Sequence, residues 1–199
     1  MLIESLENYR IILASRSLRR QQLMRELGID FEIVLRDFDE SYPEGLRGDE
    51  IAKFVASAKA KAFEGEAGRN DIIITADTIV WCNGKVLGKP ADINDALIML
   101  RKISGNTHEV ITGVNLLTSS QNVTFTESTK VTFEEMSDRE ILHYVEKYAP
   151  YDKAGGYGIQ EWIGLAACSH IDGSYFNVVG LPVHRLYKEL KKIITGDRI

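Results

Sequence analysis

The sequence predicts an α/β fold in which helices flank a mixed, twisted sheet. A short apolar run at residues 11–14 is followed at once by polar residues and a helical pattern, which is typical of a buried strand. A longer apolar run at 72–81 ends in Asn83-Gly84, a dipeptide that favours a hairpin into 85–87. Hairpins require antiparallel neighbours, and the alternation of strand and helix patterns along the chain favours an α/β sheet. The sheet is therefore expected to be mixed.

The strand patterns follow one another in a regular order. The expected strands are 11–14, 31–35, 72–81, 85–87, 109–118 and 123–133. The last two are joined through 119–122, a polar segment suited to a turn. The segment 177–182 is expected to be a final loop before the last helix.

Apolar residues at helical spacing predict five helices between and after these strands. They centre on 23–27, 51–62, 93–100, 141–148 and 183–193. The expected end signals are Gly28 as a C-terminal stop, Asp49 and Asp92 as N-caps, a capping box of Ser137 and Glu140, and Pro182 at the start of the last helix.

Composition restricts the class of protein. The chain has 199 residues, of which 44% are hydrophobic and 27% charged, the balance of a soluble globular protein of one domain or two tightly joined lobes. Lys and Arg number 24 against 29 Asp and Glu, a net charge of −5, which argues against a nucleic-acid or membrane-surface partner. The start lacks the features of a signal peptide and no apolar run reaches membrane-spanning length, so a cytoplasmic location is expected. Cys82 and Cys168 have no zinc-ligand spacing and are expected to be reduced thiols.

A basic turn follows the first strand. Acidic residues are favoured at a helix start, because unpaired N–H groups and the positive end of the helix dipole lie there, yet this start carries three arginines, two serines and no acid. A bound phosphate resolves the conflict by accepting from the N–H groups, the hydroxyls and the guanidinium groups. The residues are Ser15, Arg16, Ser17, Arg19 and Arg20. The alternative is an ordinary serine-capped helix whose arginines extend into solvent.

Asp77 places a carboxylate inside an apolar strand. Burying an unpaired carboxylate costs several kcal/mol, so Asp77 needs a partner, a metal or a cavity. A phosphohydrolase uses such a group to activate water or to hold Mg²⁺ against phosphate oxygens. A structural Asp bonded to backbone amides at a strand kink is the competing interpretation.

Further charged residues complete a candidate phosphate site. Lys89 lies between Gly88 and Pro90 just before a helix, where it either faces an anion or is an exposed loop lysine. Lys59 flanks the apolar stripe of its helix and either reaches a ligand or lies along the helix surface. An acidic cluster at 37–40 either shares a metal with the strand carboxylate or is a solvated loop.

A glycine-rich loop occupies residues 152–160 with the sequence DKAGGYGIQ. Its glycines allow the backbone to approach a ligand closely, and Gln160 offers both a donor and an acceptor to a base edge. The alternative is a tight connector in which Tyr157 packs inward. The four histidines show no paired metal-ligand spacing, and no metal site is assigned to them.

Six segments resemble the Maf family of nucleoside triphosphate pyrophosphatases. In order along nearly the whole chain they are LASRSLRR (13–20), TADTIV (75–80), LGKP (87–90), ISGNTHEVITG (103–113), DKAGGYGIQ (152–160) and NVVGLPV (177–183). The resemblance implies a single functional domain over 1–199, with two lobes around a central cleft as in inosine triphosphate pyrophosphatase. It also implies hydrolysis between the α and β phosphates of a nucleoside triphosphate, a divalent cation (Mg²⁺ or Mn²⁺), and a homodimer as one form of assembly.

The resemblance also implies roles for individual residues. Asp77 matches the proton acceptor, while Arg19, Thr78 and Gln160 match selectivity positions and resemble the branch that acts on dTTP and UTP. Phosphate- and metal-handling positions are matched by Ser15, Arg20, Lys59, Lys89 and Glu40, with Glu40 and Asp77 implied as metal ligands. Asp39 is the alternative to Glu40 as the second acid.

One position departs from the family. Leu18 stands where proline is usual, which softens the turn without deleting a contact. Two other functions stay open: a pyrophosphatase for 7-methyl-GTP or other modified nucleotides, and a nucleotide-binding regulator of septum formation. The carboxylate of Asp77 favours an enzyme, because a pure binder gains little from a negative charge facing a triphosphate.

Overall fold

A computed structural model describes residues 2–196 and confirms the mixed α/β fold class. The chain divides into two compact units, and each consists of segments distant in sequence. The first unit comprises Met1–Asp77, Thr112–Glu127 and Gly180–Ile199, and the second comprises Thr78–Ile111 and Ser128–Val179. Neighbouring strands of the sheet follow the order β2-β1-β3-β5-β6-β7, and β4 pairs with β3.

The strands are β1 (Arg10–Leu13), β2 (Glu32–Ile33), β3 (Asp71–Cys82), β4 (Lys85–Leu87), β5 (Thr107–Leu117), β6 (Asn122–Phe133) and β7 (Cys168–Asp172). The helices are α1 (Leu2–Leu6), α2 (Leu18–Glu26), α3 (Asp49–Lys61), α4 (Ile93–Ile103), α5 (Asp138–Tyr148), α6 (Trp162–Ala167), α7 (Tyr175–Val179) and α8 (Val183–Thr195), with a 3₁₀ turn η1 (Ala154–Gly156).

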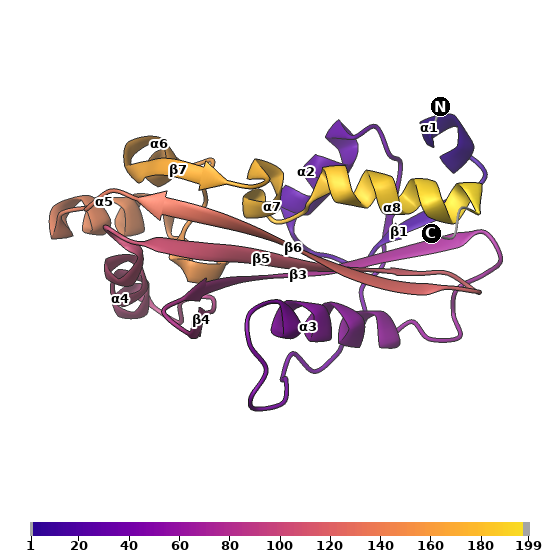
Figure 1. The fold of residues 1–199 in the computed structure, drawn as a ribbon, viewed down its shortest axis with the longest axis horizontal. Coiled ribbons are helices and arrows are strands. Elements are labelled where there is room, and N and C mark those ends of the chain that lie inside the picture. Colours follow the sequence, from indigo (N-terminus) through magenta and orange to yellow (C-terminus); the bar gives the residue numbers. More distant parts are fainter. Residues whose placement is uncertain (1, 197–199) are drawn as a thin grey trace. The chain divides into compact units, whose positions relative to one another are not determined.

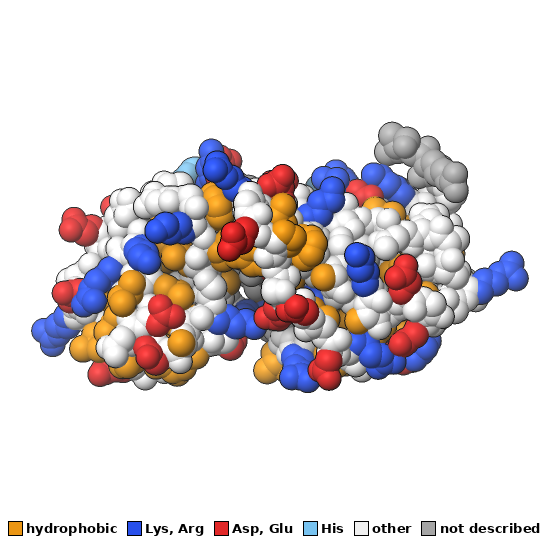
Figure 2. Space-filling view, turned by 90° about the horizontal axis from the view of Figure 1, so that it is seen from below, with side chains coloured by type: hydrophobic (Ala, Val, Ile, Leu, Met, Phe, Trp, Pro, Cys, Tyr) orange, Lys and Arg blue, Asp and Glu red, His pale blue; other side chains and the backbone are white. Residues whose placement is uncertain are grey.

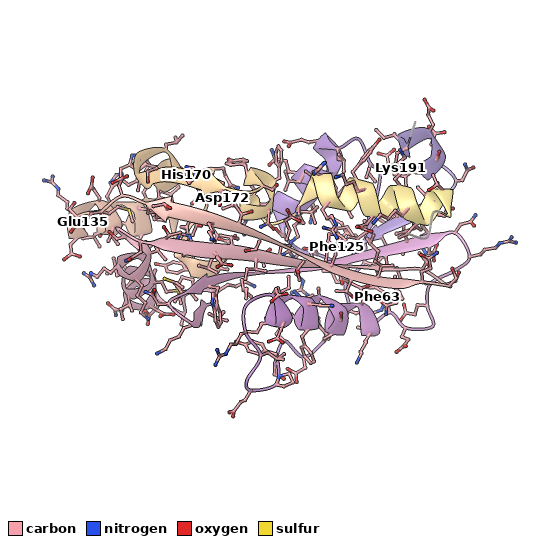
Figure 3. All side chains as sticks on the ribbon, in the orientation of Figure 1. Phe63, Phe125, Glu135, His170, Asp172 and Lys191 are labelled. Carbon is pink, nitrogen blue, oxygen red and sulfur yellow. The ribbon has the colours of Figure 1, made fainter. Side chains whose placement is uncertain are left out.

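In the first unit, helices cover both faces of the strands. β1 runs parallel to β2 and to the start of β3, with Leu13 opposite Ile74. Figure 1 shows α3 on one side of these strands and α2 and α8 on the other. Phe63 packs with apolar residues of β1 and β3 on the α3 side, and the Arg185 guanidinium of α8 lies 5.5 Å from the centre of the Phe125 ring (Figure 3). β1 and the start of β3 carry apolar residues on both faces, as expected of strands that are covered on both sides.

In the second unit, β3 continues into the predicted hairpin. Val80 pairs with Leu87 in antiparallel register, and Asn83 and Gly84 both have positive φ, 50° and 75°. Two positive φ values at the centre of a two-residue turn match the twist of the flanking strands, so this Asn-Gly signal was confirmed. β6 and β7 form a second antiparallel pair with an irregularity at Thr132/Phe133.

Several predicted helix signals are present in the structure. Ser137 and Glu140 form the complete capping box of α5, and Asp92 accepts from the Asp95 N–H at the start of α4. Gly28 adopts φ 75° directly after α2, and Pro182 is the N-cap of α8. These signals are local, which is why the sequence alone reveals them.

Three predictions about the fold were wrong in part. Asp49 is not a cap: it is the first residue of α3, and the N-cap is Gly48 at φ 46°, with no side-chain cap bond. The strand expected at 31–35 shrinks to two residues in β2. The loop expected at 177–182 begins inside α7, a five-residue helix too short to show a periodic pattern.

The surface carries side chains of both charges, in keeping with the near balance of basic and acidic residues in the sequence. On the face seen in Figure 2, Lys and Arg side chains alternate with Asp and Glu side chains, without a broad area of one sign. Within residues 2–196, no helix combines the length and apolarity needed to cross a membrane.

Candidate active site

The basic turn joins β1 to α2 in the first unit and is held by its serines. Ser17 is the N-cap of α2, and its hydroxyl accepts from the Arg20 N–H at 3.4 Å. The Ser15 hydroxyl accepts from the Ser17 N–H at 3.2 Å, and its carbonyl accepts from the Gln21 amide at 3.3 Å. The first turn of α2 contains no acidic residue. The helix start therefore presents a positive dipole end with no protein acid in its first turn.

The Arg20 side chain extends from this turn to backbone carbonyls of two other segments. Its Nε donates to the Gly180 carbonyl and its Nη1 to the Ala76 carbonyl, both at 2.8 Å, and Nη1 lies 3.4 Å from the Ser15 hydroxyl. Burial lowers the pKa of Arg20, and the neighbouring Arg19 lowers it further, while Asp77 acts in the opposite sense. Arg20 thus fastens the turn to the middle of β3 and places a cationic group beside Asp77.

Asp77 ends the part of β3 that belongs to the first unit. Its Oδ1 lies 2.7 Å from Lys59 Nζ, and the side chains are only 20% and 12% exposed. Lys59 also donates to the Ala76 carbonyl at 3.3 Å. The carboxylate predicted to need a partner has one, supplied by a lysine of α3 that points inward instead of lying along the helix. Burial lowers the pKa of Lys59, opposed by the attraction of Asp77.

The acidic segment 37–40 lies against the same lysine. The Phe38 ring lies under the Lys59 ammonium, whose Nζ is 4.9 Å from the ring centre. Burial lowers the pKa of Lys59, and the charge of Glu40 is one of those that oppose this shift. Asp39 instead accepts from the Ser41 N–H at 2.8 Å and the Ser41 hydroxyl at 2.7 Å. These contacts lower the pKa of Asp39 and commit its carboxylate to a local turn. The two acids thus differ in their surroundings: Asp39 is bonded to Ser41, whereas the charge of Glu40 acts on Lys59.

The oxygen donors of this site suit a divalent cation shared with a phosphate. No cluster of three or more Asp, Glu, His or Cys side chains in the described part of the chain forms a complete metal cage. Mg²⁺ commonly takes one or two protein carboxylates and completes its shell with water and substrate phosphates. Asp77 of β3 and Glu40 of the segment before α3 both act on Lys59, and two carboxylates are the number that such a shell uses.

Gln160 lies on the glycine-rich loop of the second unit. Gly155 and Gly156 both adopt φ 70°, and a side chain at Gly155 would meet Val80 at 2.8 Å. Tyr157 packs inward, as the structural alternative expected, and its hydroxyl lies 2.7 Å from His108 Nε2. Gln160 itself is exposed. The loop is a folded connector, as the structural alternative expected, and Gln160 is its one outward amide.

The two remaining predicted residues also belong to the second unit. Thr78 is half-buried and follows Asp77 on β3, so their side chains leave opposite faces of the strand. Lys89 is exposed, and the carbonyl of the preceding Gly88 accepts from the Gly155 N–H at 2.9 Å. This bond joins the LGKP segment to the glycine-rich loop.

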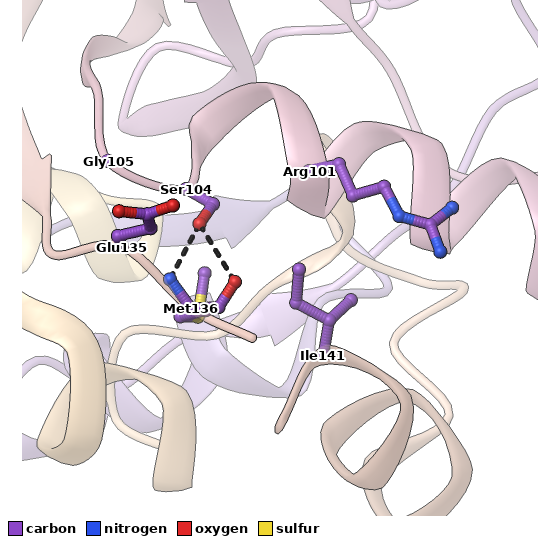
Figure 4. A pocket seen from close by; sticks show the side chains of 6 residues that line it. All are labelled: Arg101, Ser104, Gly105, Glu135, Met136 and Ile141. Atoms are coloured by element: carbon purple, nitrogen blue, oxygen red, sulfur yellow. Dashed lines mark hydrogen bonds between the residues drawn. The ribbon is translucent and has the colours of Figure 1, made fainter. Parts of the chain in front are cut away.

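A surface pocket of the second unit contains none of the predicted site residues (Figure 4). It is lined by Arg101, Ser104, Gly105, Glu135, Met136 and Ile141. The Ser104 hydroxyl accepts from the Met136 N–H at 2.7 Å and lies 3.4 Å from the Met136 carbonyl, which closes the end of α4 against the segment after β6. The serine has a structural role here.

Sequence reasoning missed the residues that hold the site together. Phe38 contacts Lys59, and the Gly180 carbonyl accepts from Arg20. Each partner comes from a distant segment of the chain, so no local sequence pattern indicates these contacts. Tyr144 of α5 is also fully buried, and a hydroxyl on the buried face of a predicted helix is a sequence signal for a further polar contact.

Comparison with known proteins shows the family of this chain. The model of the family described as "Maf-like protein" matches residues 10–193. A protein of Flavobacterium johnsoniae named dTTP/UTP pyrophosphatase is 50% identical over 194 residues, which cover 98% of this chain and all of that protein. A protein of Phocaeicola vulgatus with the same name is 52% identical over 193 residues, 96% of this chain and all of that protein. A solved nucleoside-triphosphatase / dITP/XTP pyrophosphatase from Mycobacterium abscessus aligns over 94% of each chain at 12% identity and a TM-score of 0.40. The family match and the identities of about half over nearly the full length show that the chain belongs to the Maf family.

Proposed function

We propose that residues 1–199 form one functional domain that hydrolyses dTTP and UTP to the nucleoside monophosphate and pyrophosphate. The observation that carries the proposal is the Asp77 carboxylate held 2.7 Å from Lys59 and beside Arg20, next to a helix start without an acid. The names of the relatives at about 50% identity supply the substrate class. A house-cleaning role belongs to the same proposal.

The chemistry follows from the charges of the site. Asp77 removes a proton from a water molecule, whose oxygen attacks the α phosphorus while the bond from that phosphorus to the α–β bridging oxygen breaks. The electron pair leaves with pyrophosphate, and the cationic groups of Arg19, Arg20 and Lys59 stabilise the charge that develops on the phosphate oxygens. Ser15 and the N–H groups of α2 orient the same oxygens.

Asp77 and Glu40 would hold a divalent cation, Mg²⁺ or Mn²⁺, which when bound neutralises phosphate charge. In the second unit, we propose Gln160 and Thr78 as the residues that select the pyrimidine base, together with Arg19 of the first unit. Lys89 is proposed to neutralise phosphate charge. A cytoplasmic location and assembly as a homodimer belong to the same proposal.

Pyrophosphate release from a panel of triphosphates tests this function. The panel contains dTTP, UTP, CTP, dATP, dGTP and 7-methyl-GTP, each with Mg²⁺, with Mn²⁺ and with a chelator. We expect dTTP and UTP to be turned over fastest, and the chelator to abolish turnover. Hydrolysis in ¹⁸O-labelled water should place the label in the monophosphate, because attack occurs at the α phosphorus.

Each other outcome favours a different function. Fastest turnover of 7-methyl-GTP would indicate a pyrophosphatase for modified nucleotides. Tight nucleotide binding without turnover would indicate the regulator of septum formation. Label in pyrophosphate would contradict attack at the α phosphorus.

A further inference from the structure

The hydroxyl of Tyr144, on α5, contacts both ends of the turn that carries Gln160. The Gly158 N–H donates to the Tyr144 Oη at 3.0 Å, and the same hydroxyl donates to the Glu161 carboxylate. The turn is closed by the Glu161 N–H, which donates to the Gly158 carbonyl at 3.0 Å. One side chain from another element therefore fixes the first and last residues of the four-residue segment 158–161.

A buried lysine completes this group of contacts. Lys153 is only 9% exposed, and its Nζ lies 3.2 Å from Glu161 Oε1 and 2.7 Å from Asp152 Oδ1. Glu161 thus faces Lys153 with one carboxylate oxygen and accepts from Tyr144 with the other. Burial and the bond to Glu161 raise the pKa of Tyr144, which keeps its hydroxyl protonated as a donor.

The packing around the turn leaves no space for a side chain at Gly158. A side chain at Gly158 would lie 2.9 Å from the Glu161 carboxyl carbon and 3.1 Å from Lys153 Cε. The Tyr144 ring is fully buried and stacks on Tyr148 with ring centres 5.1 Å apart. Within the turn Ile159 is buried, whereas Gln160 is exposed. The turn presents a single outward side chain from a fixed base.

We infer that Tyr144, with Glu161 and Lys153, is a positioning group that fixes Gln160 for hydrogen bonding to a pyrimidine base. The inference rests on the proposed function, because that function assigns base selection to Gln160. An amide pairs with a base edge only in a narrow range of orientations, and a segment rich in glycine does not hold such an orientation by itself. The contacts to Tyr144 remove that freedom before the nucleotide arrives, which reduces the entropy lost on binding.

The test compares Tyr144→Phe with Tyr148→Phe. The control is matched because Tyr148 lies on the same helix and stacks on Tyr144, while its hydroxyl has no part in the turn contacts described above. Dissociation constants are measured by calorimetry for dTMP, which contains the base, and for pyrophosphate, which does not. For Tyr144→Phe we expect dTMP binding to weaken about tenfold, equivalent to about 1.4 kcal/mol, with pyrophosphate binding unchanged. Tyr148→Phe should change neither constant.

A second variant covers the case in which Tyr144→Phe does not fold, which its melting temperature would reveal. Glu161→Gln keeps an acceptor for the Tyr144 hydroxyl but removes the charge that faces Lys153. It should weaken dTMP binding by a smaller factor, again without an effect on pyrophosphate. The inference is overturned if the folded variant binds dTMP as the wild type does, or if the affinities for dTMP and pyrophosphate fall together. Failure of the wild type to release pyrophosphate from dTTP would instead contradict the proposed function, because both binding constants are measured without turnover.

Discussion

Lys59 Nζ lies 2.7 Å from Asp77 Oδ1, with both side chains largely removed from water. This ion pair joins α3 to β3, the strand that carries Asp77, the proposed general base. The Phe38 ring contacts the lysine from a third segment, and the charge of Glu40, in the same segment, acts on it. A half-buried carboxylate fixed in place by a lysine has a defined position from which to remove a proton from water. The pair therefore connects the fold of the first unit to its proposed chemistry.

Asp77→Asn should reduce pyrophosphate release from dTTP by about 1,000-fold or more, because an amide accepts no proton. The amide has nearly the same shape as the carboxylate, so circular dichroism should show an unchanged fold. Asp71→Asn is the matched control, since Asp71 lies on the same strand and its carboxylate accepts from the Gly68 N–H at 2.9 Å. Near-normal turnover by the Asp77→Asn variant would exclude Asp77 as the general base.

Arg20→Lys should lower both stability and activity. A lysine cannot donate to the Ala76 and Gly180 carbonyls in the fork geometry of the guanidinium, and leaving a buried acceptor unpaired costs about 1–3 kcal/mol. The melting temperature should fall by about 2–4 °C for each kcal/mol lost in a chain of this size. Arg16→Lys changes the same residue type at an exposed position of the same turn and should melt as the wild type does. Equal melting temperatures for both variants would show that Arg20 has no structural role.

Leu18→Pro should stabilise the protein. Leu18 is the first residue of α2, where proline is tolerated, and Ser17 before it has φ −65° and ψ 112°, a conformation compatible with a following proline. Its side chain is 77% exposed, so little packing is lost. Restricting the unfolded chain should add about 0.4–1 kcal/mol to the free energy of unfolding, measurable by urea denaturation. A loss of stability would mean that the Leu18 N–H makes a bond that the turn requires.

His108 should make the stability of the protein depend on pH. Burial lowers its pKa from 6.5 to about 4, so between these values the unfolded chain binds a proton that the folded chain does not. The contribution is fully present above pH 6.5 and is lost as pH falls toward 4, by roughly 3 kcal/mol in total. His108→Gln should flatten this part of the stability profile, measured by urea denaturation from pH 4 to 8. His143→Gln, at an exposed position of α5, is the control and should leave the slope in place.

The sequence predicted those parts of the fold whose causes are local. The Asn83-Gly84 turn and the Ser137–Glu140 capping box each depend on a few consecutive residues, and both are present in the structure. α7 was missed because five residues hold barely one helical turn, and the cap of α3 was misassigned because Gly48 replaces a polar side chain there. Short elements are defined by their tertiary neighbours, which no local pattern contains.

For the candidate site, the sequence indicated which residues matter but not what they contact. Asp77 was expected to need a partner, yet the choice of Lys59 depends on how α3 packs against β3. Arg20 was expected to face a phosphate, whereas the structure also directs it to carbonyls 56 and 160 residues away along the chain. Such contacts depend on chain topology, so only the folded structure supplies them.

The position of Asp77 and Thr78 on β3 has a consequence for how chains of this kind can change in length. Asp77, the proposed general base, and Thr78, a proposed selectivity residue, are consecutive on β3. A one-residue insertion or deletion earlier in the strand would therefore exchange the faces of the sheet that their side chains occupy. Loss of function would follow even if every side chain were retained. The exposed Asn83-Gly84 turn lies outside this alternation of faces, and a side chain at Gly84 would meet no neighbour within 4 Å, although its φ of 75° favours glycine. We expect evolutionary length variation, and successful insertion of a peptide tag, at this turn and not in the strand before it.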